Sequence, residues 1–240
     1  MKRVLVILSI SSAVLFYSCN SGPDSEEAKK EDTTAVVTAP QPEAKPAFTP
    51  FKIVAIQHKV KDFDKSVTGY FSRDSLLNAF GISHLIIARD NKVSNLVFVM
   101  DKIEDVDKSK SFFNNPKVVE VMKNAGVSKP PAYSYAEMVR YDDSPRKYPE
   151  GLLVSHHVKD YDAWLKLFER SEGKEIRAEH GLIDRGIARD FYDPNMIYVM
   201  FEISDMAKAK ARMASPELKK IMADSGVDTP PTMRWFKVVL

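Results

Sequence analysis

Five histidines are the side chains of this sequence best suited to acid–base or ligand chemistry near neutral pH. His58 and His156 occupy matching places near the ends of two similar apolar runs, His157 follows directly, and His84 lies in another such run. A neutral imidazole in a cavity can act as a base or hold a metal or haem. The catalytic candidates are therefore His58, His84 and His156. The alternative is that they are strand-end rings satisfied by hydrogen bonds or solvent.

Two Arg-Asp pairs form a second recurring feature. Arg89-Asp90 and Arg189-Asp190 stand at the same place in the two halves of the chain. Arginine could grip a carboxylate or phosphate of a ligand with its planar guanidinium group, or it could fix a hairpin turn. The recurrence in both halves favours the structural role. The ligand-binding candidates are Arg89, Arg189 and four side chains suited to an apolar pocket: His157, Tyr135, Tyr198 and Trp235.

Motifs for several common chemistries are missing from the sequence. It contains no His-Glu-x-x-His or Cys/His cluster, so no metal site is expected. It also contains no glycine-rich phosphate loop, Gly-x-Ser-x-Gly elbow or Cys/His nucleophile pair. The absence of these motifs disfavours enzymatic activity, which is kept as an alternative.

The elements that position these residues belong to a duplicated unit. Residues 81–131 align with residues 181–231 without a gap, and both contain Ile-Ala-Arg-Asp, a Gly-Val pair and a final Pro-Pro. Upstream, His58-Lys-Val-Lys-Asp-Phe-Asp matches His156-His-Val-Lys-Asp-Tyr-Asp at a separation of 98 residues, two fewer than the 100 residues that separate 81–131 from 181–231. The first helix of the second copy therefore contains two extra residues. Two long matches of this kind indicate two copies of one structural unit.

Apolar periodicity and capping residues predict the same order of elements, β-α-β-β-α-β, in both copies. Asp62, Asp105, Asp160 and Asp205 are suited to helix N-caps, and Gly81, Gly126, Gly181 and Gly226 to helix ends. A proline after Asn115 or Ser215 restarts the second helix of each copy. The expected strands are 53–60, 82–89, 95–103 and 133–139, then 152–158, 182–189, 196–203 and 233–239.

The third strand of each copy is apolar on both faces. In the second copy Ile197, Val199 and Phe201 point one way, and Met196, Tyr198 and Met200 point the other; Phe98 and Met100 repeat this in the first copy. In a sheet with one solvent-exposed face, apolar and polar residues would alternate along each strand. The second face must therefore be covered, most simply by the sheet of the other copy.

These features resemble the dimeric α+β barrel superfamily. The resemblance rests on the β-α-β-β-α-β order, the His-x-Val-x-Asp-[Phe/Tyr]-Asp opening, the Ala-Arg-Asp hairpin and the Pro-Pro ending, and it covers nearly all of residues 51–240. It implies an α+β fold of two tandem ferredoxin-like units, 51–141 and 151–240, joined by a linker, 142–150, and packed sheet to sheet as a pseudo-dimer. A cavity would lie between the sheets or under the helices. The superfamily includes cofactor-free monooxygenases, haem-degrading enzymes and members without known activity, so haem stays open and no cofactor is otherwise expected.

The N-terminus predicts export and lipidation. Lys2 and Arg3 precede an apolar run too short to span a bilayer, and Ser18-Cys19, with the one cysteine of the chain, follows. We expect residues 1–18 to be a signal peptide and Cys19 to be acylated, on the periplasmic or cell-surface side. An ordinary signal peptide cut elsewhere is the alternative. Residues 19–50, rich in Pro, Glu, Lys, Thr and Ala, are expected to be a disordered tether.

Three functions remain open. After loss of the signal peptide the basic and acidic side chains balance at 33 each, which argues against a nucleic-acid partner. The first hypothesis is a lipid-anchored, monomeric protein that binds a small apolar or carboxylate-bearing ligand without clear catalysis. The second is a cofactor-independent oxygenase, isomerase or cyclase with a histidine base, and the third is a protein-binding subunit of an envelope assembly. A cavity with converging polar groups favours the first two.

Overall fold

The computed structural model of the protein describes residues 48–71 and 74–239, which belong to one compact unit, Pro46–Leu240. The expected signal peptide, the lipidated Cys19 and the tether as far as residue 47 lie outside the described residues. Of the helices in the described ranges, none has the length and apolar character needed to cross a bilayer.

The two copies contain the same elements in the same order. The first repeat consists of β1 (Phe51–Lys59), α1 (Phe63–Phe71), α2 (Asp74–Ala79), β2 (Ile82–Asp90), β3 (Leu96–Ile103), α3 (Val106–Phe113), α4 (Pro116–Asn124) and β4 (Ala132–Tyr141). The second repeat consists of β5 (Glu150–His157), α5 (Tyr161–Phe168), α6 (Ser171–Glu179), β6 (Leu182–Asp190), β7 (Met196–Ile203), α7 (Met206–Ala214), α8 (Pro216–Asp224) and β8 (Thr232–Val238). One expectation needs correction, because two helices rather than one follow the first strand of each repeat.

Local side-chain caps set the helix boundaries that the sequence predicted. The Asp160 carboxylate accepts a hydrogen bond from the Ala163 amide at 3.0 Å, and Asp105 does the same from the Lys108 amide at 2.8 Å. At the other end of α8, Gly226 adopts φ +88° and the Val227 amide donates to the Met222 carbonyl at 3.0 Å. This is the Schellman geometry, in which glycine avoids the strain of a left-handed backbone.

The eight strands form one closed antiparallel barrel in the order β1-β3-β2-β8-β5-β7-β6-β4. Within each repeat the strand order is that of a ferredoxin-like unit, and the repeats join at two seams, where β2 pairs with β8 and β4 with β6. Arg89 faces Lys237 across the first seam, and Glu137 faces Arg189 across the second. Closure leaves no free sheet edge among the described strands.

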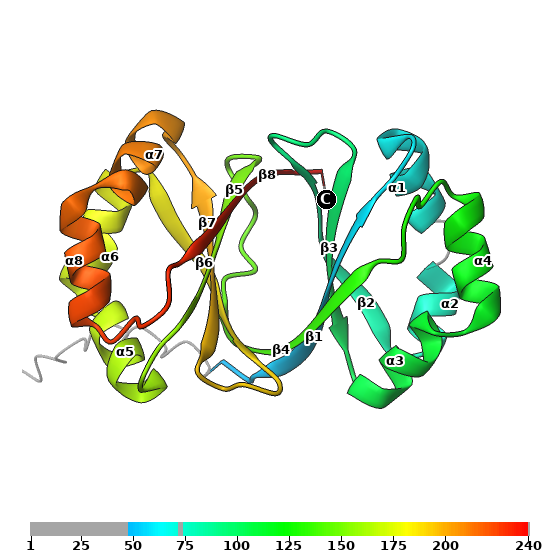
Figure 1. Cartoon of the computed structure of the whole chain (residues 1–240), viewed down its shortest axis with the longest axis horizontal. Helices are drawn as coiled ribbons and strands as arrows, with labels where there is room; N and C mark the ends of the chain where they lie inside the picture. Colours follow the sequence, from blue (N-terminus) through cyan, green and yellow to red (C-terminus); the bar gives the residue numbers. More distant parts are fainter. Residues whose placement is uncertain (1–47, 72–73, 240) are drawn as a thin grey trace, which may run out of the picture. The chain divides into compact units, whose positions relative to one another are not determined.

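The two faces of the barrel wall are both apolar, as the third-strand pattern predicted. Phe98, Met100 and Met200 lie in a core cluster inside the barrel that draws on both repeats. The alternate residues, including Val99 and Val199, belong to two separate clusters beneath the helices of their own repeat. The helices cover the two outer flanks of the barrel (Figure 1). Each repeat therefore has its own core under the helices, and the two share a third.

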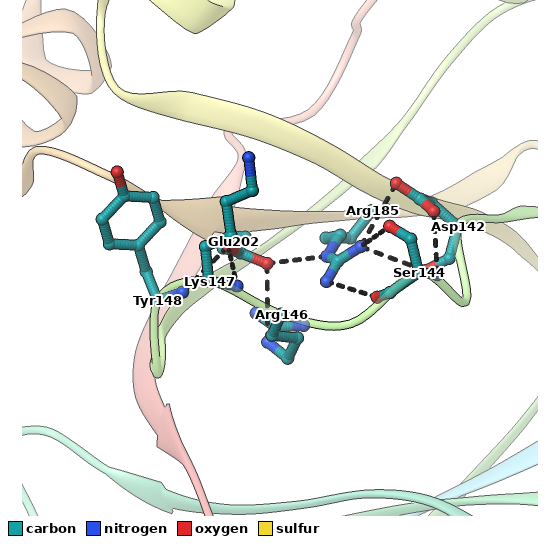
Figure 2. Close-up of polar contacts among 7 residues, drawn as sticks. All are labelled: Asp142, Ser144, Arg146, Lys147, Tyr148, Arg185 and Glu202. Carbon is teal, nitrogen blue, oxygen red and sulfur yellow. Dashed lines mark hydrogen bonds and ion pairs between the residues drawn. The ribbon is translucent and has the colours of Figure 1, made fainter.

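The segment between β4 and β5 is held by a buried ion pair. Arg185 Nε lies 2.8 Å from Glu202 Oε2, and the two side chains are only 5% and 3% exposed. Figure 2 shows the connecting segment on this pair: Arg185 donates to the Ser144 hydroxyl and carbonyl, and Glu202 Oε1 accepts from the Lys147 and Tyr148 amides. The segment thus supplies hydrogen bonds to both members of the buried ion pair.

Candidate ligand site in the second repeat

His156 is positioned by strand alternation. Leu152 and Val154 of β5 face the helices, so His156 does too, and its side chain lies beneath the helices of the second repeat. The residue is 3% exposed, and neither Nδ1 nor Nε2 has a hydrogen-bond partner. The Trp164 ring meets the imidazole edge-on, with 5.5 Å between ring centroids. Burial lowers the pKa of His156 from 6.5 to about 4, so the ring is neutral at physiological pH.

A cavity of about 190 Å³ lies beside this ring. It is largely apolar, and Leu167 and Ile221, both exposed, lie at its rim, so solvent reaches it from the helical surface. An engineered apolar cavity of about 150 Å³ binds benzene, so this space suits a compact molecule of about one ring. The lining residues are Val154, His156, Trp164, Leu167, Phe168, Gly173, Ile176, Arg177, Leu182, Val199, Phe201, Arg212, Met213, Leu218, Ile221, Met222 and Ser225.

The other polar side chains that line this cavity already have partners. Arg177 donates to both carboxylate oxygens of Asp184 and stacks on Phe168, with its guanidinium carbon 3.8 Å from the ring centroid. Arg212 pairs with Glu217 at 2.9 Å, and the Ser225 hydroxyl donates to a backbone carbonyl of its own helix. Among the described lining residues, His156 is the side chain whose buried polar atoms both lack a hydrogen-bond partner. A buried polar group without a partner calls for an explanation.

The first repeat fills the corresponding space. His58 matches His156 in sequence, and burial lowers its pKa to about 4 as well, but the cavity beside it measures only about 20 Å³. Phe112 and Phe113 stand where the second repeat has Arg212 and Met213, and both are buried. A second cavity of the first repeat, next to these phenylalanines, measures about 100 Å³. A more open pocket of about 320 Å³ lies on the first repeat between Phe113 and Tyr133, away from His58. The cavity of about 190 Å³ beside a buried histidine thus belongs to the second repeat.

His84 belongs to a buried hydrogen-bonded network of the first repeat. Its Nδ1 lies 3.0 Å from Asp101 Oδ1, and the other oxygen of Asp101 accepts from the Tyr70 hydroxyl. Asp101 is fully buried under the helices, where the second repeat has Phe201 instead. A buried carboxylate needs such donors to offset its desolvation. The structure therefore keeps His84 apart from His156 and from the cavity beside it.

The remaining candidates are placed at separate points. The Arg89 and Arg189 guanidinium groups stack on Phe63 and Tyr161, with 3.9 and 3.7 Å from carbon to ring centroid. His157, next to His156, points the other way and lies 2.7 Å from Asp228. These contacts favour structural roles.

The three aromatic candidates are also separated. Tyr135 and Trp235 lie at matching positions under the helices of their own repeats, and neither faces the barrel interior. Tyr198 lines the interior and donates its hydroxyl to Asp190 at 2.9 Å. Burial raises the pKa of Tyr198 above its ordinary range, and the Asp190 carboxylate adds to the effect.

The site fits neither a metal nor haem as it stands. No group of three His, Cys, Asp or Glu side chains in residues 48–71 and 74–239 is arranged around a common point. The neutral His156 has the donor chemistry of a haem ligand. A cavity suited to about one ring is, however, too small for the four pyrroles of a porphyrin. Haem would require α6 and α8 to move apart.

Sequence reasoning missed two things about this site. It expected the strand-end imidazoles to be satisfied, whereas both nitrogens of His156 lack partners. It also passed over Phe201, Arg212 and Met213, which help to form the cavity. A comparison of the two copies at aligned positions could have found them. Phe201, Arg212 and Met213 each stand where the first repeat has a different residue type.

Comparisons with known proteins agree on the fold. No family model and no curated protein matches the chain. Among solved structures, a candidate monooxygenase from Fusobacterium nucleatum has a TM-score of 0.50 at 10% identity, over 82% of this chain and 94% of that one. A candidate monooxygenase from Lactobacillus acidophilus has a TM-score of 0.49 at 15% identity, over 78% and 94%. A haem-degrading enzyme from Listeria monocytogenes has 0.41 at 10%, over 78% and 98%.

At these identities the likeness concerns the fold and leaves the function open. Together with the strand order, it shows that the described part of the chain has the fold of a pseudo-dimeric α+β barrel, formed by two ferredoxin-like repeats in one polypeptide.

Proposed function

We propose that the second repeat binds a small, mostly apolar molecule of about one ring that carries a single hydroxyl or carbonyl group. The observation that carries this proposal is His156, a buried neutral imidazole without partners that lines an apolar cavity. One imidazole nitrogen donates and the other accepts, so the ring can serve either a carbonyl or a hydroxyl. The apolar lining would supply the affinity and the imidazole the orientation.

The depressed pKa supports binding over catalysis. With a pKa of about 4, His156 is a weak base and holds a proton poorly. A general base that works near neutral pH has its pKa near 7. Hydrogen bonding by the neutral ring has no such requirement, and it relieves the desolvation of the two nitrogens.

A second candidate is a cofactor-independent oxygenase in which His156 takes a proton from an acidic ligand. The observation that favours it is the position of a perturbed histidine in a cavity, which is common in catalytic sites. Two of the solved structures named above are candidate monooxygenases. Oxygen consumption with a bound phenol, lost in His156→Phe, would support this candidate over simple binding.

We further propose that the chain is exported and anchored through an acylated Cys19, and that it is a monomer. The short apolar N-terminal run and the single cysteine after it support the anchor. The closed barrel supports the monomer, because each repeat already pairs with the other at both seams. Mass spectrometry of the N-terminal peptide from its own host should detect a lipid on Cys19, absent in Cys19→Ala. An unmodified Cys19 in the mature protein would refute the anchor.

The binding proposal is tested with phenol and toluene, which differ by one hydroxyl group. We expect phenol to bind the full chain more tightly than toluene, and His156→Phe to weaken phenol about tenfold while toluene changes little, since one hydrogen bond is worth about 1.4 kcal/mol here. His157→Phe is the matched control, because the adjacent ring lies outside the cavity. Equal phenol affinity in wild type and His156→Phe would refute the proposal.

A further inference from the structure

The barrel interior contains a cavity of about 180 Å³ that is separate from the site under the helices. It lies between the two repeats, and its apolar part includes Phe98, Met100, Leu153 and Met200. Exposed Met233 also lines it, so the cavity reaches solvent at one end of the barrel.

A break in the symmetry of the duplicated unit creates this space. Gln57 of β1 reaches across the interior to Arg234 of β8, and with its amide suitably oriented its oxygen accepts from both terminal nitrogens of Arg234, at 3.0 Å from Nη2. Gln57 is matched by Ser155 in the second repeat, and Arg234 is matched by Ser134 in the first repeat. These serines are too short to fill the corresponding half of the interior, and both line the cavity.

Arg234 enters this cavity without a negative partner. None of the described residues that line the cavity is acidic, and the neutral Gln57 is the partner of the guanidinium group. Guanidinium has five N–H donors and keeps its charge, so donors remain available toward the cavity. Ser134, Ser155 and Thr232 add hydroxyl groups to the lining. Tyr198 also lines it, but its hydroxyl is engaged with Asp190.

We propose that the barrel interior binds a small monocarboxylate with an apolar body of about one ring. The carboxylate would pair with Arg234, for which a bidentate geometry is favourable. The apolar body would lie toward Phe98, Met100 and Met200, which disfavours a fully hydrated inorganic anion. This ligand differs in charge and location from the one proposed for the His156 cavity, and neither proposal depends on the other.

The test uses benzoate, its neutral analogue benzamide, and inorganic phosphate as probes for the full chain by titration calorimetry. We expect benzoate to bind, and benzamide at least about tenfold more weakly, because the charge-assisted pair is lost. Arg234→Met should reduce benzoate affinity about ten- to a hundredfold. Arg170→Met, which removes an exposed arginine outside the cavity, should leave benzoate affinity unchanged.

A second variant keeps the test informative if Arg234→Met does not fold. Ser155→Leu leaves Arg234 in place and fills part of the cavity, so it should fold and exclude benzoate. The proposal is overturned if benzoate does not bind, if benzamide binds equally well, or if benzoate affinity survives in Arg234→Met or in Ser155→Leu. Phosphate that competes as strongly as benzoate would likewise overturn the assignment to an apolar carboxylate.

Discussion

Replacing His156 with phenylalanine should make the protein more resistant to acid. The folded chain keeps this ring neutral, with a pKa of about 4, whereas an unfolded histidine has a pKa of 6.5. The unfolded state therefore binds more protons as the pH falls below about 6.5, and the free energy of unfolding decreases until the pH reaches the folded pKa. The phenylalanine variant lacks this contribution.

The size of the effect follows from these two pKa values. At pH 4.5 an unfolded His156 is about 99% protonated and the folded one about a quarter, which corresponds to a loss of about 2.5 kcal/mol relative to pH 7.5. His58, with the same depressed pKa, adds a similar loss that both proteins share. The stability of His156→Phe relative to wild type should thus rise by about 2.5 kcal/mol between pH 7.5 and 4.5.

The assay is urea denaturation at both pH values, followed by far-UV circular dichroism so that the signal does not depend on Trp164. Carboxylates that titrate in this range are common to both proteins and cancel in the comparison. His157→Phe is the control, because the same substitution at the adjacent surface residue removes no buried imidazole. A stability difference between His156→Phe and wild type that is the same at both pH values would refute the assignment of His156 as a buried neutral group.

Two further predictions concern the fold. Arg185→Met should lower the free energy of unfolding by about 2–4 kcal/mol, because it removes the nearer charged partner of the buried Glu202 and leaves only Arg146, whose Nε lies 3.8 Å away. Urea denaturation measures this loss. A loss below about 1 kcal/mol, as for an exposed pair, would contradict the interpretation of a buried pair. Gly151→Ala should destabilise by about 1–3 kcal/mol, because the added carbon would overlap the Phe236 ring. Gly173→Ala in α6 should change the stability less, because the nearest atom to its added carbon is Arg177 Nη1 at 3.3 Å. The opposite order of the two alanine variants in thermal denaturation would show that these close contacts do not control stability.

Much of the fold could be predicted because its signals are local or repeated. The aspartate caps and the glycines at helix ends act within a few residues, so they are readable from the sequence and the structure confirms them. The apolar residues on both faces of the third strands predicted a covered inner surface, and Phe98, Met100 and Met200 form that surface. The division of each first helix into two was missed; in the second repeat, Arg170 at the start of α6 makes no side-chain cap hydrogen bond of the kind that a sequence motif indicates.

The resemblance implied a cavity between the sheets or under the helices, but the size and lining of the cavities could not be predicted, because packing between distant segments decides them. His58 and His156 have nearly identical neighbours along the chain, yet the cavity beside His156 measures about 190 Å³ and the one beside His58 about 20 Å³. The difference comes from Phe112 and Phe113 against Arg212 and Met213, more than fifty residues away from the histidines in sequence. Similarly, Gln57 and Arg234 meet only because the barrel closes.

The sequence by itself therefore determined the duplicated β-α-β-β-α-β unit and the need to cover both faces of its sheet. Hydrophobic periodicity and capping depend on residues close together in the chain, so they require no knowledge of the fold. Only the tertiary structure decided that His156 lacks hydrogen-bond partners and that Arg234 faces a cavity without a carboxylate. These properties are set by what surrounds a side chain, and its surroundings come from segments far apart in sequence.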